Sequence, residues 1–286
     1  MSEEQKEAAT LYLVPTPIGN LQDLSPRALE VLKTVTLIAA EDTRRTLALL
    51  SAFGIRNTLI SYREQNHQRA AARILDHLRS GASAALVSDA GMPTLSDPGR
   101  LLVAEAAAEG LRVISLPGPS AITAALAASG LPCGRFLFLG FPPREEGRLR
   151  AWAEELSQET ATMVFFESPR RLPVTLSVLA GVWPERRAVI AREISKIYEE
   201  YRRGRLAELA EECGQFVGEI TVVLEGAPER REPVIDRRWL ELGRALMRGE
   251  KMSCARVAEL LARLGCGERR ALYRALSGSD DGNEAD

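Results

Sequence analysis

The sequence predicts an α/β protein with two α/β domains, a cleft between them and a small helical module at the C-terminal end. Three observations predict this class. In residues 11–131, short apolar runs alternate with helical patterns, which is typical of βαβ units around a parallel sheet. In residues 132–228, strands and helices follow each other less regularly, which favours some antiparallel pairing. Residues 229–276 contain only helical patterns.

The first domain has five apolar runs, each followed by a helical pattern that a cap residue or a glycine delimits. Ser25 and Pro26 open the first helix as N-cap and first helical residue, and Gly54, Gly81 and Gly110 end later helices. The expected strands are Leu11–Val14, Thr36–Ala39, Thr58–Ser61, Ala84–Val87 and Arg112–Leu116. The helices expected after the first are Thr43–Phe53, Asn66–Arg79, Leu101–Glu109 and Ser120–Ser129.

The second domain follows residues 131–134, where proline and glycine lie close together. Ser168 and Pro169 repeat the serine–proline pattern and predict a helix that extends to about Ala180. The expected strands are Arg135–Leu139, Ala161–Phe166, Ala188–Arg192 and Ile220–Leu224, and the other expected helices are Gly147–Ser157 and one near Leu206–Glu212.

The C-terminal module follows a polar segment, residues 225–232, which contains Pro228 and indicates a linker. Its expected helices are Arg237–Arg248, Cys254–Leu264 and Glu268–Leu276, and the last two have helix-turn-helix spacing. Residues 229–276 hold 12 basic and 7 acidic residues in a chain of net charge −2. This excess predicts a polyanionic partner, with a solvated arginine-rich face as the alternative. Residues 1–10 are expected to form a flexible tail and residues 277–286 an acidic one.

Composition narrows the class further. The chain has 286 residues, of which 45% are hydrophobic and 27% charged, as in soluble globular proteins. No apolar run approaches the ~20 residues that span a bilayer, and the polar N-terminus does not resemble a signal peptide. We therefore expect a cytoplasmic protein without membrane contact. Four scattered cysteines and only two histidines disfavour disulfides and a metal site.

Polar loops follow five of the expected strands. The richest is Val87–Gly99, which contains two Asp, two Pro and two Gly residues. The loop of residues 15–21 has one glycine where a dinucleotide fold has GxGxxG, which disfavours a Rossmann enzyme. Open α/β folds bind ligands at the carboxyl ends of their strands. Five such loops therefore predict one ligand cleft between the two domains.

Three of these loops carry carboxylate, guanidinium or hydroxyl groups that could bind a ligand or take part in catalysis. Glu41 and Asp42 precede Arg44 and Arg45, although Asp42 or Thr43 could simply cap a helix. Residues 165–171 again place a carboxylate and two guanidinium groups at a strand end. Ser120 opens a helix, where its hydroxyl or N–H group could either cap the helix or contact a ligand.

Six motifs occur in a fixed order: LVPTPIGNLQDLSPRA, AEDTRRT, LVSDAGMPTLSDPG, LPGPSAITAAL, FLGFPPR and FFESPRRL. From Leu11 to about Leu224, the chain resembles the bacterial methyltransferases of small-subunit ribosomal RNA within the tetrapyrrole-methylase superfamily. The segment LLARLGCGERRALYRAL also resembles the small C-terminal module of that family. The resemblance implies a homodimer that binds S-adenosylmethionine, folded, between two α/β domains. It also implies 2′-O-methylation of a cytidine ribose in the decoding region of 16S rRNA, with naked rRNA or the assembled 30S subunit as the acceptor.

The resemblance also assigns the contacts to the methyl donor. They are Ile18, Gly91, Met92, Pro93, Ser120, Ala121 and Phe166. The superfamily often has Gly-Asp-Pro where this chain has Gly91-Met92-Pro93. Because Met92 has no carboxylate, any contact that it makes must use its backbone or its thioether.

Methyl transfer to a ribose hydroxyl needs an aligned acceptor and benefits from a group that takes the hydroxyl proton. We expect that base among Glu41, Asp42, Asp89, Asp97 and Glu167, and favour Asp42 or Glu167 because arginines beside them could hold phosphate. Water remains an alternative, and His67 is a lesser candidate. RNA contacts are expected from Arg44, Arg45, Arg144, Arg170, Arg171, Arg269, Arg270 and Arg274, and no metal is expected.

Two alternative functions remain open from the sequence. The first is methylation of a tetrapyrrole or another small molecule, which the basic module disfavours. The second is a non-catalytic RNA-binding assembly protein, which the complete set of strand-end loops disfavours.

Overall fold

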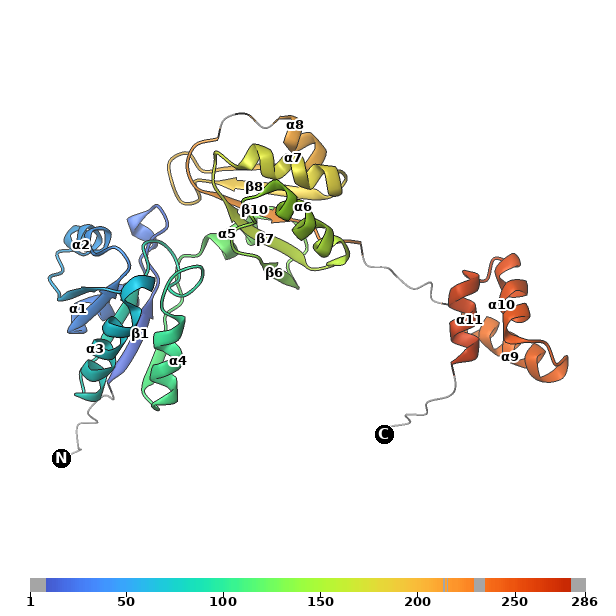
Figure 1. The fold of residues 1–286 in the computed structure, drawn as a ribbon, viewed down its shortest axis with the longest axis horizontal. Helices are drawn as coiled ribbons and strands as arrows, with labels where there is room; N and C mark the ends of the chain where they lie inside the picture. The colour runs from blue at the N-terminus through green and yellow to red at the C-terminus, as the bar shows by residue number, and fades with distance from the viewer. Residues whose placement is uncertain (1–8, 213, 215, 229–234, 279–286) are drawn as a thin grey trace. The chain divides into compact units, whose positions relative to one another are not determined.

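The computed structural model describes residues 9–212, 214, 216–228 and 235–278. Most of the expected N-terminal tail, part of the expected linker and most of the acidic tail therefore lie outside the described residues. The chain divides into two compact units, the first ending at Ala227 and the second beginning at Pro228. The first unit contains both sheets, and the second is helical (Figure 1).

The first sheet has the strand order β3-β2-β4-β1-β5, and every neighbouring pair is parallel. Its central strands β2 and β4 are buried along their full length, as expected for a parallel sheet covered on both faces. The strands are β1 Thr10–Val14, β2 Leu37–Ala40, β3 Leu59–Ser61, β4 Ala84–Val87 and β5 Arg112–Ser115.

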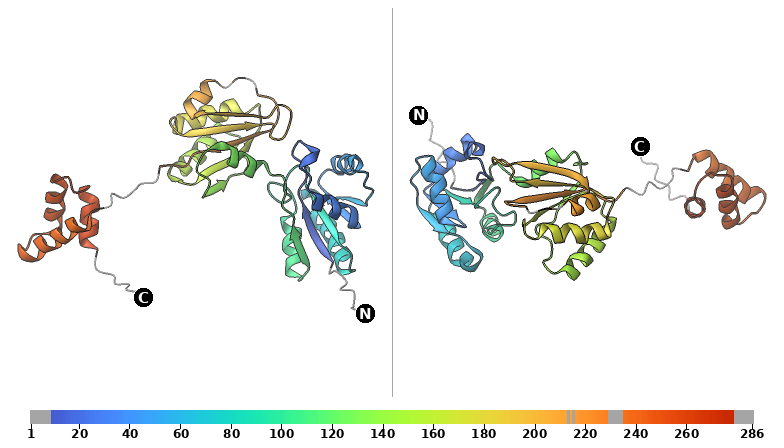
Figure 2. Two further views of the ribbon diagram at one scale, coloured as in Figure 1. Left: turned by 180° about the vertical axis from the view of Figure 1, so that it is seen from behind. Right: turned by 90° about the horizontal axis from the view of Figure 1, so that it is seen from above.

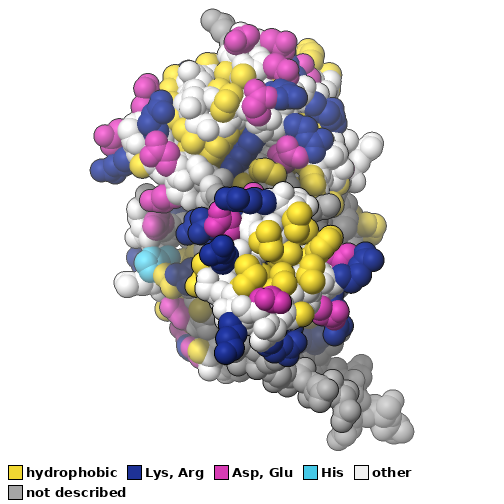
Figure 3. Space-filling view, turned by 90° about the vertical axis from the view of Figure 1, so that its right-hand side faces the viewer, with side chains coloured by type: hydrophobic (Ala, Val, Ile, Leu, Met, Phe, Trp, Pro, Cys, Tyr) yellow, Lys and Arg dark blue, Asp and Glu magenta, His cyan; other side chains and the backbone are white. Residues whose placement is uncertain are grey.

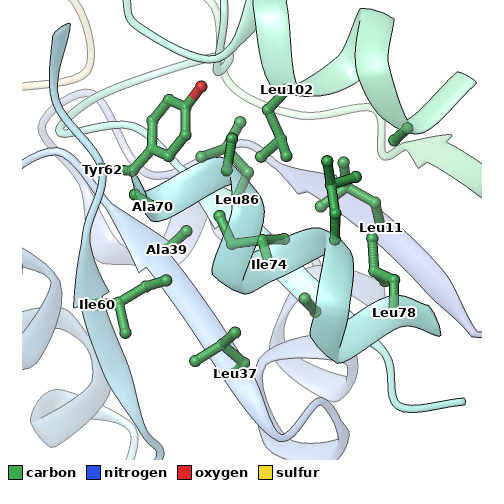
Figure 4. Close-up of a cluster of buried hydrophobic side chains, with 14 of the residues drawn as sticks. Leu11, Leu37, Ala39, Ile60, Tyr62, Ala70, Ile74, Leu78, Leu86 and Leu102 are labelled. Carbon is green, nitrogen blue, oxygen red and sulfur yellow. The ribbon is translucent and has the colours of Figure 1, made fainter. Parts of the chain in front are cut away.

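Helices cover both faces of this sheet. Alternate residues of each strand point to opposite sides, so each strand contributes apolar side chains to both layers of helices. In β2, Leu37 and Ala39 pack with α3 and α4, whereas Ile38 and Ala40 pack with α1 and α2. Figure 4 shows Leu37, Ala39 and Ile60 beside Ile74 of α3, in the first of these clusters. The helices are α1 Pro26–Thr34, α2 Thr43–Ala52, α3 His67–Arg79 and α4 Arg100–Ala108.

The second sheet has the order β6-β7-β10-β8-β9. Only β6 and β7 are parallel, so the expected antiparallel pairing is confirmed for the other three pairs. The strands are β6 Phe136–Phe138, β7 Thr162–Glu167, β8 Arg187–Arg192, β9 Glu200–Arg205 and β10 Ile220–Leu224.

Helix α5 connects the two sheets. It follows β5 of the first sheet, yet Ile122, Ala125 and Leu126 pack against β7, β8 and β10 of the second. The opposite face of the second sheet is covered by three other helices (Figure 2). The amino end of α5 is thereby fixed where the two sheets approach each other. The four helices are α5 Ala121–Ser129, α6 Glu146–Glu155, α7 Leu172–Val182 and α8 Leu206–Glu211, and 3₁₀ turns occur at Leu21–Asp23, Glu64–Asn66 and Leu156–Gln158.

Two expectations for the second sheet were wrong or incomplete. Helix α7 begins at Leu172, three residues after the Ser168–Pro169 pair that predicted its start. The N–H of Ser168 donates to the Glu167 carboxylate at 2.7 Å, and its C=O accepts from Arg171 and Leu172, so this pair forms a turn. Strand β9 was not predicted, because Glu200–Arg205 consists largely of charged residues.

The second unit has three helices among its described residues: α9 Arg237–Gly249, α10 Cys254–Arg263 and α11 Arg269–Ser277. They enclose a separate small core of Val257, Ala258, Leu261, Leu272 and Leu276. In the view of Figure 3, apolar side chains gather on one face of this unit, and Lys, Arg, Asp and Glu side chains lie around them.

Candidate functional site

A cavity of about 450 Å³ lies within the first unit, between groups from both sheets. From the first sheet come Ile18, after β1, and residues 89–92 and 95–97, after β4. The start of α5, the end of β7 and the start of β10 form the opposite wall. Its volume lies within the ~300–1,000 Å³ range of small-molecule sites.

Hydrogen bonds join two loops that form this cavity, the loop after β1 and the loop after β4. Thr16 and Gly91 exchange backbone hydrogen bonds of 3.0 and 2.9 Å as an isolated antiparallel bridge. The Thr16 hydroxyl donates to the C=O of Ser88, and the Ser88 hydroxyl donates to the C=O of Gly91. Gly91 has φ +82°, a conformation that favours glycine. The polar residues that follow β1 and β4 thus form one rigid wall.

The structure gathers most of the residues assigned to the methyl donor. Ile18, Gly91, Met92, Ser120, Ala121 and Phe166 all line the cavity. Pro93 does not line it and is buried. The thioether of Met92 accepts a 3.7 Å hydrogen bond from the Ser115 hydroxyl. The cavity therefore contains six of the seven assigned residues, held by four different elements.

Ser120 is the N-cap residue of α5, but its side chain forms no cap hydrogen bond. By contrast, the Ser25 hydroxyl caps α1 by accepting from the N–H of Ala28 at 3.1 Å. Ser120 lines the cavity instead. Its hydroxyl can therefore form a hydrogen bond with a ligand without giving up a bond that caps α5.

Sequence reasoning missed one part of the wall, residues 218–221. They precede or begin β10, and a strand's amino end is not where parallel sheets bind ligands. However, β10 is antiparallel to β7, with Ile220 opposite Glu167. The start of β10 therefore lies at the end of β7. Phe141 was also missed, although it belongs to the FLGFPPR motif and its ring lies 5.6 Å from that of Phe166.

Asp42 lies outside the lining of this cavity. It is the N-cap of α2, and its carboxylate accepts from the N–H of Arg44 at 2.9 Å and from the Arg44 guanidinium at 3.1 and 2.8 Å. These hydrogen bonds from Arg44 hold the pKa of Asp42 well below its usual range. The structure thus shows the capping role that was the alternative for Asp42.

Glu167 lines the cavity, but its side chain is fully buried. One carboxylate oxygen accepts from the N–H of Ser168 at 2.7 Å, and the other from the Thr175 hydroxyl at 2.6 Å. Arg171 lies 3.4 Å from the second oxygen and also donates to the C=O of Pro143. These bonds hold the turn between β7 and α7 together. Asp42 and Glu167 remain candidates for the base, but both carboxylates already have partners.

Three other carboxylates gather at the ends of β2 and β4. Asp89 and Asp97 line the cavity, and Asp89 accepts from the N–H of Asp42 at 3.0 Å. Burial, together with the negative charges of Glu41 and Asp89, raises the pKa of Asp97 to about 6. Burial and the charge of Asp89 also raise the pKa of Glu41. Two of these carboxylates therefore lie in the cavity wall, and that of Asp97 has a pKa raised to about 6.

A second cavity of about 380 Å³ adjoins this wall. It is lined by α2 residues including Arg45, by the loop after β1 and by Ser88 and Asp89. Asp89 lines both cavities and lies 3.4 Å from Arg45. Of the three carboxylates, Asp89 therefore belongs to the walls of both cavities, whereas Asp97 lines only the first.

The arginines expected to bind RNA fall into three groups. Arg45 lines the second cavity. The Arg171 guanidinium donates a hydrogen bond to the C=O of Pro143. The side chains of Arg44, Arg144 and Arg170 are exposed and line neither of these two cavities. Arg269, Arg270 and Arg274 are exposed on α11 of the second unit.

The described residues also bear on metal binding and on membrane insertion. No group of three or more His, Cys, Asp or Glu side chains in this part of the chain could hold a metal ion. Likewise, none of the described helices is both long enough and apolar enough to cross a membrane.

Comparison with known proteins places the chain and its fold in a family. Residues 10–210 match the family model of tetrapyrrole (corrin/porphyrin) methylases. Cobalt precorrin-4 methyltransferase shares the fold, with a TM-score of 0.56 at 15% identity over 78% of this chain and 96% of that one. So does uroporphyrin-III C-methyl transferase from Thermus thermophilus, complexed with S-adenyl homocysteine, with a TM-score of 0.52 at 21% identity over 76% and 97% of the two chains. The chain is thus a tetrapyrrole-methylase-type protein.

Curated relatives identify the group within that class. A protein from Mesorhizobium japonicum is 43% identical over 95% of both chains. One from Thermotoga maritima is 47% identical over 76% of this chain and 98% of its own length. Both are named ribosomal RNA small subunit methyltransferase I. The chain belongs to this ribosomal RNA small subunit methyltransferase I family, and the expected fold class is confirmed.

Proposed function

We propose that this protein transfers a methyl group from S-adenosylmethionine to the 2′-oxygen of a cytidine ribose in the decoding region of 16S rRNA. The observation that carries the proposal is the cavity in the first unit. Its walls bring together six residues that the family resemblance assigns to the donor. The relatives' name supports small-subunit ribosomal RNA as the acceptor.

The cavity fits the chemistry of this donor. Ile18, Met92 and Phe166 offer apolar surface for its adenosine and methionine parts, and Ser120 offers a hydroxyl. Asp89 and Asp97 place negative charge where a cationic ligand would lie. When bound, S-adenosylmethionine supplies a methyl carbon on a positively charged sulfur, which is an excellent leaving group. The protein then mainly has to align the acceptor oxygen with that carbon.

The acceptor ribose is proposed to approach through the second cavity. Arg45 lies in its wall, and an arginine there can hold a phosphate of the RNA backbone. Arg44, Arg144 and Arg170 extend the exposed basic surface of the first unit. Phosphate contacts position the RNA without reading its sequence, so selectivity would come from RNA shape and from an unstacked cytidine.

The second unit is proposed to add RNA affinity through Arg269, Arg270 and Arg274 of α11. An enzyme that methylates ribosomal RNA works where ribosomes are made, so we place it in the cytoplasm.

A homodimer is also part of this proposal. Ile197 and Tyr198 in the β8–β9 turn are 94% and 71% exposed, and Val217 in the neighbouring loop is 73% exposed. Lys196 and Glu219 form a 3.1 Å ion pair that holds these two loops together. Such exposed apolar side chains are candidates for a subunit contact. If they form it, light scattering should report twice the chain mass for the wild type and the chain mass for Ile197→Arg.

The test of the proposed function is transfer of labelled methyl groups. Purified protein is incubated with labelled S-adenosylmethionine and, separately, with 30S subunits, naked 16S rRNA or uroporphyrinogen. We expect label in the ribose of a single cytidine, with either RNA acceptor. Label in the tetrapyrrole would replace the proposal with small-molecule methylation. RNA binding without any label would replace it with a non-catalytic role.

A further inference from the structure

The loop between β8 and β9 connects the second sheet to the loop that follows β1 of the first sheet. Near its start, Ile194 lines the cavity proposed to hold the donor and packs in one apolar cluster with Ile18. The Ser195 hydroxyl donates a hydrogen bond to the carboxylate of Asp23, which ends the 3₁₀ turn after Ile18. The β8–β9 loop is therefore a direct link between two walls of the cavity.

The stem of Lys196 lies directly against the backbone of Gly19. A Cβ atom at Gly19 would overlap the Cγ atom of Lys196 and would lie 3.1 and 3.2 Å from its Cε and Cδ atoms. Only a glycine therefore leaves room for this side chain. Gly19 directly follows Ile18, which lines the donor cavity. The position of Ile18 thus depends on that of Lys196.

The ammonium group of Lys196 is held by carboxylates of the second sheet. It lies 2.8 Å from the Glu193 carboxylate and 3.1 Å from that of Glu219, which lines the cavity. The Glu193 carboxylate also accepts a hydrogen bond from the N–H of Glu219 at 2.8 Å. The side chains of Lys196 and Glu193 are 26% and 18% exposed, so solvent screens this pair less than a pair on the open surface. One side chain thus connects the Glu219 wall to the loop of Ile18.

The backbone of the β8–β9 loop has an unusual conformation. Glu193 and Ser195 have φ values of 52° and 68°, which cost free energy in residues other than glycine and persist only where the surroundings enforce them. The N–H of Ser195 donates to the Glu199 carboxylate at 2.8 Å, within the same loop. The contacts of Lys196 and Ser195 therefore stabilise an arrangement that the backbone alone does not favour.

We propose that Lys196 is a positioning residue for the methyl donor. It keeps Ile18 of the first sheet in place relative to Ile194 and Glu219 of the second, so that the cavity is already shaped to bind. This inference rests on the proposed function. Without Lys196, the binding-competent arrangement is populated for only part of the time, and the apparent affinity falls by that fraction. Saturating donor restores the arrangement, so the transfer rate at saturation persists.

The first test removes the ammonium group in Lys196→Met, which keeps most of the stem. In calorimetry, the full-length variant should bind S-adenosylmethionine at least ~fivefold more weakly, within the range of interactions between contacting residues. In transfer assays with 30S subunits, KM for the donor should rise by the same factor, while kcat stays within about threefold. Lys196→Arg keeps the positive charge and should recover most of the affinity. Lys33→Met, an exposed substitution on α1, is the matched control.

The direction of the effect separates positioning from simple electrostatics. S-adenosylmethionine is positively charged at its sulfur, so the loss of a nearby positive charge would by itself favour its binding. S-adenosylhomocysteine lacks that charge. Positioning predicts that Lys196→Met binds both ligands more weakly, and S-adenosylhomocysteine by at least as large a factor. Tighter binding of S-adenosylmethionine, with unchanged binding of S-adenosylhomocysteine, would contradict the inference.

The second test changes no charge. Gly19→Ala places a methyl group where the stem of Lys196 lies, so it should also weaken the binding of both ligands. In a Lys196→Ala background the collision is absent, and Gly19→Ala should have little further effect. Gly147→Ala on α6, where a Cβ atom meets nothing within 4 Å, is the matched control. Equal effects of Gly19→Ala in the two backgrounds would show that the two residues do not act together.

Light scattering and thermal unfolding accompany these titrations. Lys196→Met and Gly19→Ala should keep the mass of the wild type and unfold at a similar temperature. Weaker donor binding together with a changed mass would assign the effect to a subunit contact and overturn the inference. If the wild-type protein binds no S-adenosylmethionine, the proposed function itself fails. Normal wild-type binding, with both variants unaffected, overturns only the role of Lys196.

Discussion

Asp97 is half-buried beside two like charges, so its ionised form should cost the folded state free energy. Its pKa rises from 3.8, the ordinary value, to about 6 in the fold. The protonated carboxyl is therefore favoured by folding. Its contribution to stability is complete below pH 4 and is lost as the pH rises through 6.

We accordingly expect Asp97→Asn to be more stable than wild type at pH 8, on the order of 1 kcal/mol once solvent screening of this half-exposed group is allowed for. The gain should shrink at pH 5, where the wild-type side chain is largely protonated. Urea unfolding at the two pH values measures it. An equal gain at both would show that the charge of Asp97 is not its cause.

The residues of the site were predictable from sequence to different degrees. Six of the seven residues assigned to the donor lie in strand-end motifs and line one cavity, so topology and resemblance were enough to predict that they lie together. The properties of Asp97 depend on Glu41, which is distant in sequence, and no local pattern reveals that interaction. Residues 218–221 were missed because their position depends on antiparallel pairing of β10 with β7.

At the level of elements, two N-cap serines are expected to behave differently. Ser25→Ala removes the hydroxyl that accepts from Ala28 and should destabilise the protein by about 1 kcal/mol. Ser120→Ala removes a hydroxyl that caps nothing and should change stability little, but should weaken donor binding. Urea unfolding and calorimetry measure the two effects. A stability loss of the same size for Ser120→Ala would mean that its hydroxyl caps α5.

The first sheet was predicted well because its strands are short apolar runs separated by amphipathic helices. The cap Ser25 and the stops at Gly54, Gly81 and Gly110 were also confirmed, and Asp42 has the capping role that was its alternative. Strand β9 could not be predicted, because its charged residues have low strand propensity and pairing with β8 holds it at the sheet edge. The Ser168–Pro169 pattern was misleading because the Glu167 carboxylate accepts the N–H of Ser168.

At the scale of the whole molecule, we regard the second unit as an addition to the first unit, which contains the cavity. The described residues of its core all lie between Ile235 and Leu276. The alignment with the Thermotoga maritima relative covers 98% of that protein but 76% of this chain, so about a quarter of this chain has no counterpart there. We infer that donor binding and chemistry belong to the first unit, and that the second adds affinity for RNA.

This division predicts the effect of replacing Arg269, Arg270 and Arg274 together by alanine. Affinity for 16S rRNA should fall, and the salt dependence of log K should become shallower by roughly 0.7–0.9 for each RNA phosphate that the variant no longer neutralises. Donor binding should be unchanged. Replacing the exposed Arg27, Arg56 and Arg73 of the first unit is the matched control. An equal fall in RNA affinity for both variants would reflect net charge alone.

The central claim is that the cavity of the first unit holds the methyl donor, and calorimetric titration with S-adenosylmethionine tests it most directly. The wild type should bind one donor per chain. Ala121→Trp, which fills the cavity, should bind none although it unfolds at a similar temperature. Ala127→Trp, on the exposed side of the same helix, should bind as wild type. Donor binding by Ala121→Trp equal to that of wild type, or no heat with the wild-type protein, would contradict the claim.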